Sequence, residues 1–536
     1  MAATTLLGTT GNDILNAPGS ISAQVDGFQG ADTITLALVN DTAQAGKGHD
    51  KITVGVAGLA TNDIQGGQGD DTLIIGTGVT IVNTTTYGGD GADLLQVSAN
   101  LGANNAFFAG NAGNDTIVLN GAATLAQVQA GQGNDSIHFN QGGTSTTVAG
   151  GKGADTLTFA AVAPASFNVN TNNGHDVLRL SAVDSATFTA GGGQGTDSIW
   201  LSTGSVSQIA GGGLADTITY IGGTALAAAT IYGDGAGVKA KGTGTGGAAD
   251  GNDLITGTAQ QASALTVYGA GGADTINFLN LLGSGVVLDG GNGHDLIGSS
   301  AMAATAILTN ATTSLVGGAG NDTIAFAGLT NSANNFIALG GDGNDSIAAF
   351  GTGLGSINGG AGSDIINYTV PGALSVGASG QVTINGGDGN DTILLGNFSA
   401  GLFSGTVASV TTLTANAGNV VYASGDKIQL SGIAQATGAN WIIATQIYVM
   451  SGASAGLTAD TMSQVGSVAV WKASDDLVIA ISADTAATCA YQLINVIGGG
   501  AQMKVTGFGA SAINSSNFGF TISTMTSVNG ISIDFT

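Results

Sequence analysis

Short alternating segments recur along the chain, and each follows a glycine-rich turn. Residues 66–75 read GGQGDDTLII, and the same unit returns at 192–199 as GGQGTDSI and at 386–393 as GGDGNDTI. Side chains alternate between the two faces of a β-strand, so the apolar residue two positions after the last aspartate points to one side. The pattern predicts many short strands, each entered through a tight turn.

The aspartate that ends each turn fixes the register of the repeat. Ile or Leu stands two positions after it in all eighteen copies, and Gly two positions before it in all but one, where Leu214 precedes Asp216. Successive copies are mostly about 18 to 23 residues apart, a period typical of solenoids. The eighteen aspartates are Asp13, Asp32, Asp50, Asp71, Asp93, Asp115, Asp135, Asp155, Asp176, Asp197, Asp216, Asp253, Asp274, Asp295, Asp322, Asp345, Asp364 and Asp391.

The residue types at these turns favour a hard cation. Glycine permits positive φ and a close approach of backbones, so that turn carbonyls can surround a carboxylate. Ca²⁺ takes about six to eight oxygen ligands of this kind. All 35 acidic residues are Asp and none is Glu, and Asp is short enough to reach an ion held by its own turn. We therefore expect the eighteen aspartates to be metal ligands for multiple Ca²⁺ ions.

The repeat resembles the G-G-x-G-x-D-x-U-x nonapeptide of the RTX (hemolysin-type calcium-binding repeat) family over about residues 8–396. The resemblance implies an all-β fold, a parallel β-roll or β-helix solenoid of about 18 coils that binds Ca²⁺ between stacked turns. The spacing is about twice the nonapeptide, which predicts two strands per coil. The second half of a coil, as in Thr144–Ala149, lacks the carboxylate, so the calcium turns are expected mainly on one edge.

The repeat divides the chain into two expected domains. Residues 1–396 form the calcium-binding solenoid, with a Gly-rich loop inserted near 235–249 that is read either as a solvated loop or as a basic finger. Residues 397–536 are expected to be a β-rich domain for capping and assembly, with strands at 441–449, 468–471 and 477–481. By the family resemblance, this domain also carries a type I secretion signal.

Composition excludes several classes of partner. The net charge is −26 and Arg179 is the one arginine, which argues against nucleic acid or an anionic membrane as partner. No run of about 18 apolar residues predicts a transmembrane segment. Cys489 is the one cysteine, so no intrachain disulfide framework exists, and bound metal is the expected staple. The N-terminus lacks the features of a cleaved secretory leader.

No enzymatic centre is expected. Gly452–Gly456 reads GASAG, which fits a nucleophile elbow, but a chain with so many glycines contains such a match by chance. Because Glu is absent, the H-E-x-x-H zinc motif cannot occur. His49, His175 and His294 each precede a repeat aspartate and are expected to be exposed turn residues rather than metal ligands.

The remaining interpretation is structural. The chain resembles RTX-type surface-layer proteins, which implies secretion, a place at the cell surface, and self-assembly outside the cell into a two-dimensional lattice or another homo-oligomer on binding Ca²⁺. Lipopolysaccharide or another surface glycan is a possible partner for attachment. The alternative is a secreted RTX adhesin or a matrix or biofilm protein that binds a glycan or a surface.

Overall fold

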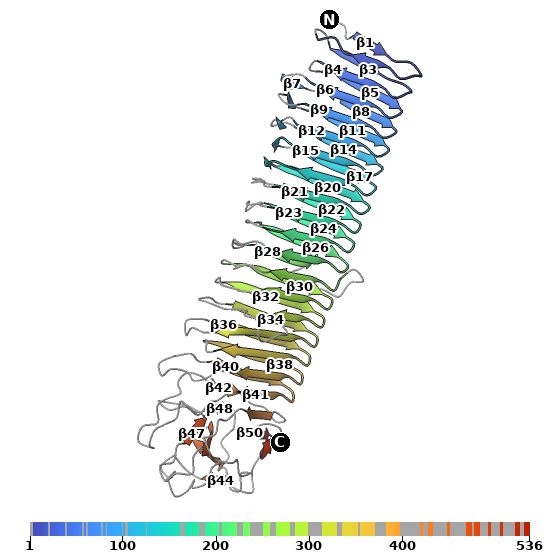
Figure 1. The fold of residues 1–536 in the computed structure, drawn as a ribbon. Helices are drawn as coiled ribbons and strands as arrows, with labels where there is room; N and C mark the ends of the chain where they lie inside the picture. Colours follow the sequence, from blue (N-terminus) through green and yellow to red (C-terminus); the bar gives the residue numbers. More distant parts are fainter. Residues whose placement is uncertain are drawn as a thin grey trace, which may run out of the picture. The chain divides into compact units, whose positions relative to one another are not determined.

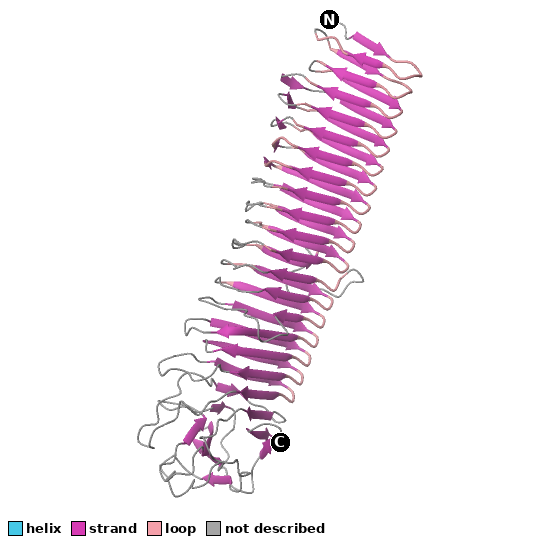
Figure 2. Cartoon of the chain, in the orientation of Figure 1, coloured by secondary structure: helices cyan, strands magenta, loops and turns pink. Residues whose placement is uncertain are grey.

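The computed structural model describes most of residues 4–396, with gaps in the loops, and short strands between Asn419 and Phe535. Every helix or strand assigned in these residues is a β-strand (Figure 2). None of the described residues form a helix long and apolar enough to cross a membrane. The chain divides into two units, Met1–Gly271 and Gly272–Thr536. Residues 236–249 of the expected inserted loop lie outside the described part.

Unit 1 is a stack of coils in which one strand lies in a first sheet and the next in a second sheet (Figure 1). Strands of neighbouring coils pair in parallel, so Tyr87 lies opposite Ala109 of the next coil. The first sheet contains β1 (Thr4–Leu7), β3 (Ala23–Asp26), β5 (Thr42–Lys47), β8 (Asp63–Gln68), β11 (Thr85–Asp90), β14 (Phe107–Ala112), β17 (Gln127–Gln132), β20 (Thr146–Lys152), β22 (Phe167–Asn173), β24 (Thr189–Gln194), β26 (Gln208–Gly213), β28 (Thr230–Asp234) and β30 (Thr266–Gly271).

The second sheet of unit 1 follows the turns that end on aspartate. Its strands are β2 (Ile14–Asn16), β4 (Thr33–Leu36), β6 (Lys51–Val54), β9 (Thr72–Ile75), β12 (Leu94–Val97), β15 (Thr116–Leu119), β18 (Ser136–Phe139), β21 (Thr156–Phe159), β23 (Val177–Leu180), β25 (Ser198–Leu201), β27 (Thr217–Tyr220) and β29 (Leu254–Gly257).

Some coils of unit 1 have a third strand, where the sequence predicted two strands per coil. The short strands β7 (Gly58–Ala60), β10 (Val79–Ile81), β13 (Asn100–Leu101), β16 (Ala123–Thr124) and β19 (Gly143–Thr144) form a parallel five-stranded sheet. A coil longer than two nonapeptides has residues left after the second strand, and in these coils a few of them align with the neighbouring coil.

The core lies between the two main sheets. The Ile or Leu two positions after each aspartate is buried, as predicted, from Ile34 in unit 1 to Ile393 in unit 2, while Leu15 of the first coil is half-buried. Aromatic rings stack in the same way: Phe139 lies over Phe159 with centroids 4.7 Å apart and planes at 2°. Full burial of one such side chain contributes about 1.5–3 kcal/mol, so each coil stabilises the next through its apolar residues.

Unit 2 repeats the arrangement and then changes it. Its first sheet contains β32 (Val286–Asn292), β34 (Thr313–Ala319), β36 (Asn335–Asp342), β38 (Leu354–Ala361), β40 (Val382–Asp388) and β42 (Asn419–Val421); its second contains β31 (Thr275–Phe278), β33 (Leu296–Gly298), β35 (Thr323–Leu329), β37 (Ser346–Gly351), β39 (Ile365–Thr369), β41 (Thr392–Gly396) and β43 (Lys427–Ser431). Both β42 and β43 continue the parallel pairing beyond Gly396.

Antiparallel pairing begins after these strands. The strand β50 (Gly530–Phe535) pairs antiparallel with β43 and with β49 (Phe520–Met525). The other C-terminal strands are β44 (Ile447–Met450), β45 (Val468–Ala473), β46 (Asp476–Ser482), β47 (Tyr491–Ile494) and β48 (Lys504–Thr506). The strands expected at 468–471 and 477–481 correspond to β45 and β46. β44 covers the end of the strand expected at 441–449, of which residues 441–446 lie outside the described part. The predicted all-β parallel solenoid is therefore confirmed, with β-strands in the C-terminal part.

Candidate metal centre

Each repeat aspartate occupies the same place in its coil, at the corner between a strand of the first sheet and a strand of the second. Asp71 follows β8 and a two-residue turn, and it immediately precedes β9. Gly67 and Gly69 in this corner have φ of 121° and 119°, a conformation that favours glycine. The glycines of the repeat therefore let the chain reverse direction close to the neighbouring coil.

One glycine of the turn leaves room for the carboxylate itself. A Cβ added at Gly66 would lie 2.5 Å from Oδ2 of Asp71 and would also collide with the carbonyl oxygen of Gly88 in the next coil. Gly192 and Gly317 face the same pair of oxygens, from Asp197 and Gly211 and from Asp322 and Gly340. At these corners, a carboxylate oxygen and a carbonyl oxygen of the next coil thus converge on a glycine.

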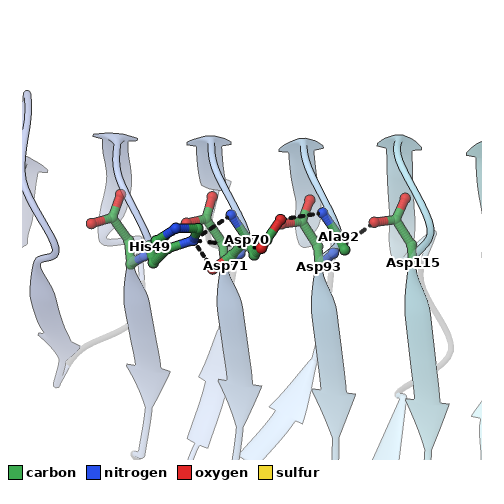
Figure 3. Close-up of polar contacts among 7 residues, drawn as sticks. His49, Asp70, Asp71, Ala92, Asp93 and Asp115 are labelled. Atoms are coloured by element: carbon green, nitrogen blue, oxygen red, sulfur yellow. Dashed lines mark hydrogen bonds and ion pairs between the residues drawn. The ribbon is translucent and has the colours of Figure 1, made fainter.

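Within each unit, the aspartates of successive coils are linked into an array, which we call the carboxylate ladder. The backbone N–H of each aspartate donates to Oδ1 of the aspartate in the next coil, at 2.6 to 2.9 Å (Figure 3). In unit 1 these bonds connect Asp13 to Asp253, and in unit 2 they connect Asp274 to Asp391. All eighteen predicted aspartates are therefore in equivalent positions, stacked within each unit.

The second carboxylate oxygen is the unusual feature of the ladder. It is buried and has no hydrogen-bond partner at Asp32, Asp50, Asp71, Asp93, Asp115, Asp135, Asp155, Asp176, Asp197, Asp216, Asp295, Asp322, Asp345 and Asp364. A buried carboxylate oxygen without a partner is strongly destabilising if the group is charged. So many equivalent orphaned oxygens indicate that the ladder needs a proton or a cation.

Burial also raises the pKa of these carboxyls. Removal from water raises the pKa of Asp71 to about 7, of Asp155 to about 7 and of Asp216 to about 8, from an ordinary value of 3.8. The hydrogen bond from the preceding coil lowers each pKa, and the neighbouring carboxylates of the ladder raise it again. At neutral pH, a cation that bound these oxygens would therefore have to displace protons from them.

The available donors are oxygens, which suits Ca²⁺ better than a transition metal. Within the described part of the chain, no three side chains of His, Cys, Asp or Glu come together as a metal site. An ion at the ladder would thus combine carboxylate oxygens with backbone carbonyls of the turns, such as that of Gly88. The residues fit an oxygen-binding cation on the evidence of the orphaned Oδ2 atoms.

The first coil is different. Asp13 is half-buried, and its Oδ2 accepts hydrogen bonds from the backbone N–H and from Oγ1 of Thr9, at 2.6 and 2.9 Å. The polar side chain of Thr9 satisfies the oxygen that has no partner in most later coils. Asp13 is thus the predicted ligand whose surroundings fit an ion least well.

A second array, which was not predicted from the sequence, is formed by the residue just before each aspartate. Oδ1 of Asn114 accepts the N–H of Asn134 at 2.7 Å, and Oδ1 of Asn321 accepts the N–H of Asn344 at 2.8 Å. His49 belongs to this array, because its Nδ1 accepts the N–H of Asp70 at 2.9 Å (Figure 3). Alignment of the repeats shows Asn frequently at this position, which was the available signal.

The three turn histidines are exposed, as predicted, and they have a structural contact. Nδ1 of His175 accepts the N–H of Thr196 at 3.1 Å, and Nδ1 of His294 accepts the N–H of Asn321 at 2.7 Å. These bonds assign the hydrogen of the neutral ring to Nε2. The histidines thus replace Asn as acceptors between coils.

A buried aspartate outside the repeat was also missed. Asp234 ends β28, and its two carboxylate oxygens accept the N–H groups of Gly251 and Gly271, each at 3.1 Å. Burial raises its pKa to about 6. Asp234 thereby holds together the ends of the long insertion between Asp216 and Asp253.

No protein-family model matches the sequence, and no curated protein matches it. The chain is a parallel β-solenoid with stacked, buried aspartates, an arrangement consistent with a β-roll.

Proposed function

We propose that this chain is a secreted structural protein of the RTX type, which folds on binding several Ca²⁺ ions and assembles with its own copies into a surface layer. The observation that carries the proposal is the carboxylate ladder, whose Oδ2 atoms are buried without partners. Among the described residues, no feature as regular as the carboxylate ladder supports catalysis, and we propose a non-catalytic role.

The eighteen predicted aspartates would hold the ions, with turn carbonyls completing the ligand sets. Bound Ca²⁺ would supply the positive charge that allows neighbouring carboxylates to ionise in a buried position. Extracellular modules bind Ca²⁺ with dissociation constants of about 10⁻⁴–10⁻³ M, so ions would be gained outside the cell and absent in the cytosol. The net charge of −26 fits this view, since metal-free carboxylates repel one another.

This chemistry makes metal binding part of folding. In a stacked solenoid each coil contacts mainly its neighbours, so removal of charge repulsion along the whole edge favours the stack cooperatively. Ion binding to the folded chain alone stabilises it by mass action. A chain that folds only where Ca²⁺ is abundant can leave the cell unfolded and assemble outside it.

The assembly step rests on the family resemblance, and electron microscopy tests it directly. The purified full chain is imaged after incubation with about 1 mM CaCl₂, with about 1 mM MgCl₂, and with a chelator. We expect ordered arrays with Ca²⁺ alone, because Mg²⁺ is smaller and dehydrates reluctantly. Dispersed, folded particles in Ca²⁺ would reject the surface layer while leaving metal-dependent folding intact.

A further inference from the structure

The outward face of the first sheet in unit 1 is hollowed. A depression of about 680 Å³ is lined by residues that include Asn111, Gln129, Gln132 and Asn172, and one of about 390 Å³ by residues that include Asn170 and Gln208. The strands concerned, β14 to β26, lie side by side in Figure 1 and pair in register. The two depressions thus follow one sheet face along the stack of coils.

The hollow has a simple cause in the sequence. One outward column of this face runs, coil by coil, through Gln129, Ala149, Asn170, Gly191 and Ala210. Small side chains in the middle of this column leave space that larger residues fill elsewhere. The next column on the side of the turns contains Gly131, Gly151 and Gly193. Because glycine has no side chain, the surface of the depressions there is mostly backbone.

Aromatic residues occupy the same column on either side of the hollow. Tyr87 stands two coils before Gln129 and contacts Phe107, with ring centroids 5.7 Å apart. Tyr232 follows Ala210 and stacks on Tyr268, with centroids 5.4 Å apart and planes at 16°. All four rings are half-buried. Along this column, the stretch that contains Gln129 and Asn170 therefore lies between Tyr87 and Tyr232, each of which contacts a second ring.

We propose that this groove, defined by Gln129, Asn170, Gly191 and Gln208 between the Tyr87 and Tyr232 pairs, binds an extended, uncharged polysaccharide along the stack. Amide side chains both donate and accept hydrogen bonds, which suits sugar hydroxyls. Aromatic rings offer apolar faces with low conformational entropy for the C–H faces of sugars. The coils repeat every ~4.8 Å, a spacing similar to the length of one sugar unit in an extended chain.

The charges of the groove and of the whole chain indicate which class of glycan fits. Lys152 is the one charged residue among those lining the two depressions. A polyanionic glycan would face a chain of net charge −26 with a single cation in the groove, which is unfavourable. Among the described residues that line the two depressions, the apolar side chains are alanines and one valine, which are too small to form the apolar patch that a stable contact with a second copy needs. An uncharged polysaccharide is the occupant that fits.

The test measures binding of linear, uncharged oligosaccharides (cello-, manno-, xylo- and malto-series) to the Ca²⁺-loaded full chain by calorimetry. The variant Gly191→Tyr fills the groove: the nearest atom to an added Cβ is a carbonyl oxygen of Ala210 at 3.9 Å, and φ is not positive. Its control is Gly55→Tyr, since an added Cβ at Gly55 meets nothing within 4 Å and Gly55 lies outside the groove. Far-UV circular dichroism checks that both variants fold.

We expect at least one series to bind, Gly191→Tyr to weaken that binding by about tenfold or more, and Gly55→Tyr to leave it unchanged. Gln129→Ala should weaken it less, because one amide is lost. Absence of binding by all the series, or equal binding by Gly191→Tyr and the unmodified chain, overturns the proposal. Loss of self-association in Gly191→Tyr without sugar binding assigns the face to a second copy instead. Sugar binding can be measured whether or not the chain forms a surface layer, so failure of the assembly proposal does not decide this one.

Discussion

The backbone N–H of Asp71 donates a 2.7 Å hydrogen bond to Oδ1 of Asp93 in the next coil, while Oδ2 of Asp93 is buried without a hydrogen-bond partner (Figure 3). Oδ1 thus accepts the hydrogen bond that joins two coils, whereas Oδ2 needs a proton or a cation. Because the two oxygens have different roles, a substitution that keeps Oδ1 and one that removes both oxygens should have different effects on stability.

Replacing Asp155 by Asn separates charge from hydrogen bonding. The Oδ1 acceptor for the N–H of Asp135 is retained, but the buried negative charge is removed. We expect Asp155→Asn to raise the melting temperature of the metal-free chain and to reduce the further rise that Ca²⁺ produces. Thermal melting with and without Ca²⁺ measures both effects.

Replacing the same residue by Ala removes both functions. Asp155→Ala leaves the buried N–H of Asp135 without its acceptor, which costs about 1–3 kcal/mol whether or not metal is present. We expect lower melting temperatures than for Asp155→Asn in both conditions. Identical behaviour of the two variants would argue against a structural role for Oδ1.

The pKa values predict an unusual pH dependence. Burial raises the folded-state pKa of Asp71, Asp115 and Asp155 to about 7 from an ordinary 3.8. Between these values the folded chain binds more protons than the unfolded chain, so stability of the metal-free protein falls as pH rises. Below about pH 4 both states are protonated at these groups, and above about pH 8 both are ionised. The predicted window of lost stability is therefore pH 4 to 8.

The measurement is denaturant unfolding of the chelator-treated chain at pH 5 and pH 8. We expect greater stability at pH 5, opposite to the usual behaviour of a protein whose carboxylates are paired. Saturating Ca²⁺ should reduce or reverse the difference, because a cation replaces the protons. Higher stability of the metal-free chain at pH 8 would contradict this prediction, because it would mean that other groups stabilise the ionised carboxylates.

A glycine at the corner should be irreplaceable even by Ala. In Gly66→Ala the new methyl group meets Oδ2 of Asp71 and the carbonyl oxygen of Gly88, and we expect a loss of about 1–3 kcal/mol. Gly191→Ala is the matched control, since its added Cβ meets no atom closer than 3.9 Å. Denaturant midpoints of the two variants should differ clearly, and equal midpoints would contradict the packing of the corner.

The exposed histidines should be replaceable by Asn but not by Ala. Nδ1 of His294 accepts the N–H of Asn321, and Asn321 itself plays the same role for Asn344 in the next coil. We expect His294→Asn to preserve stability and His294→Ala to lose about 0.5–1.5 kcal/mol. Thermal melting at neutral pH is sufficient, and an equal loss in both variants would show that the ring has some other role.

Much of this fold could be predicted because the aspartate of each repeat fixes the positions of the inward-facing residues that follow it. Once aspartate was aligned, the Ile or Leu two positions later had to point inward, and Leu73 and Ile117 are indeed buried. The glycines beside Asp71 predicted a turn with positive φ. Strong local signals that recur many times leave few alternative folds.

Other features depend on contacts that a single repeat does not reveal. The hydrogen bond from Asp71 to Asp93 joins residues 22 apart, and only the stacked structure shows which oxygen accepts it. The third strands, such as β10 and β13, were not predicted. β10 reads VTI, a strand-forming sequence, but nothing within one repeat shows that this segment pairs with the neighbouring coils. The binding groove likewise depends on the absence of bulk at Gly191, which is visible only when coils are placed side by side.

The most direct test of the account is a Ca²⁺ titration of the metal-free full chain at pH 7.5, followed by far-UV circular dichroism, with Mg²⁺ as the control ion. We predict that β-structure is reduced after chelation and increases cooperatively as Ca²⁺ passes about 10⁻⁴–10⁻³ M, with little response to Mg²⁺. A chain that shows full β-structure after exhaustive chelation, unchanged by Ca²⁺, would contradict it.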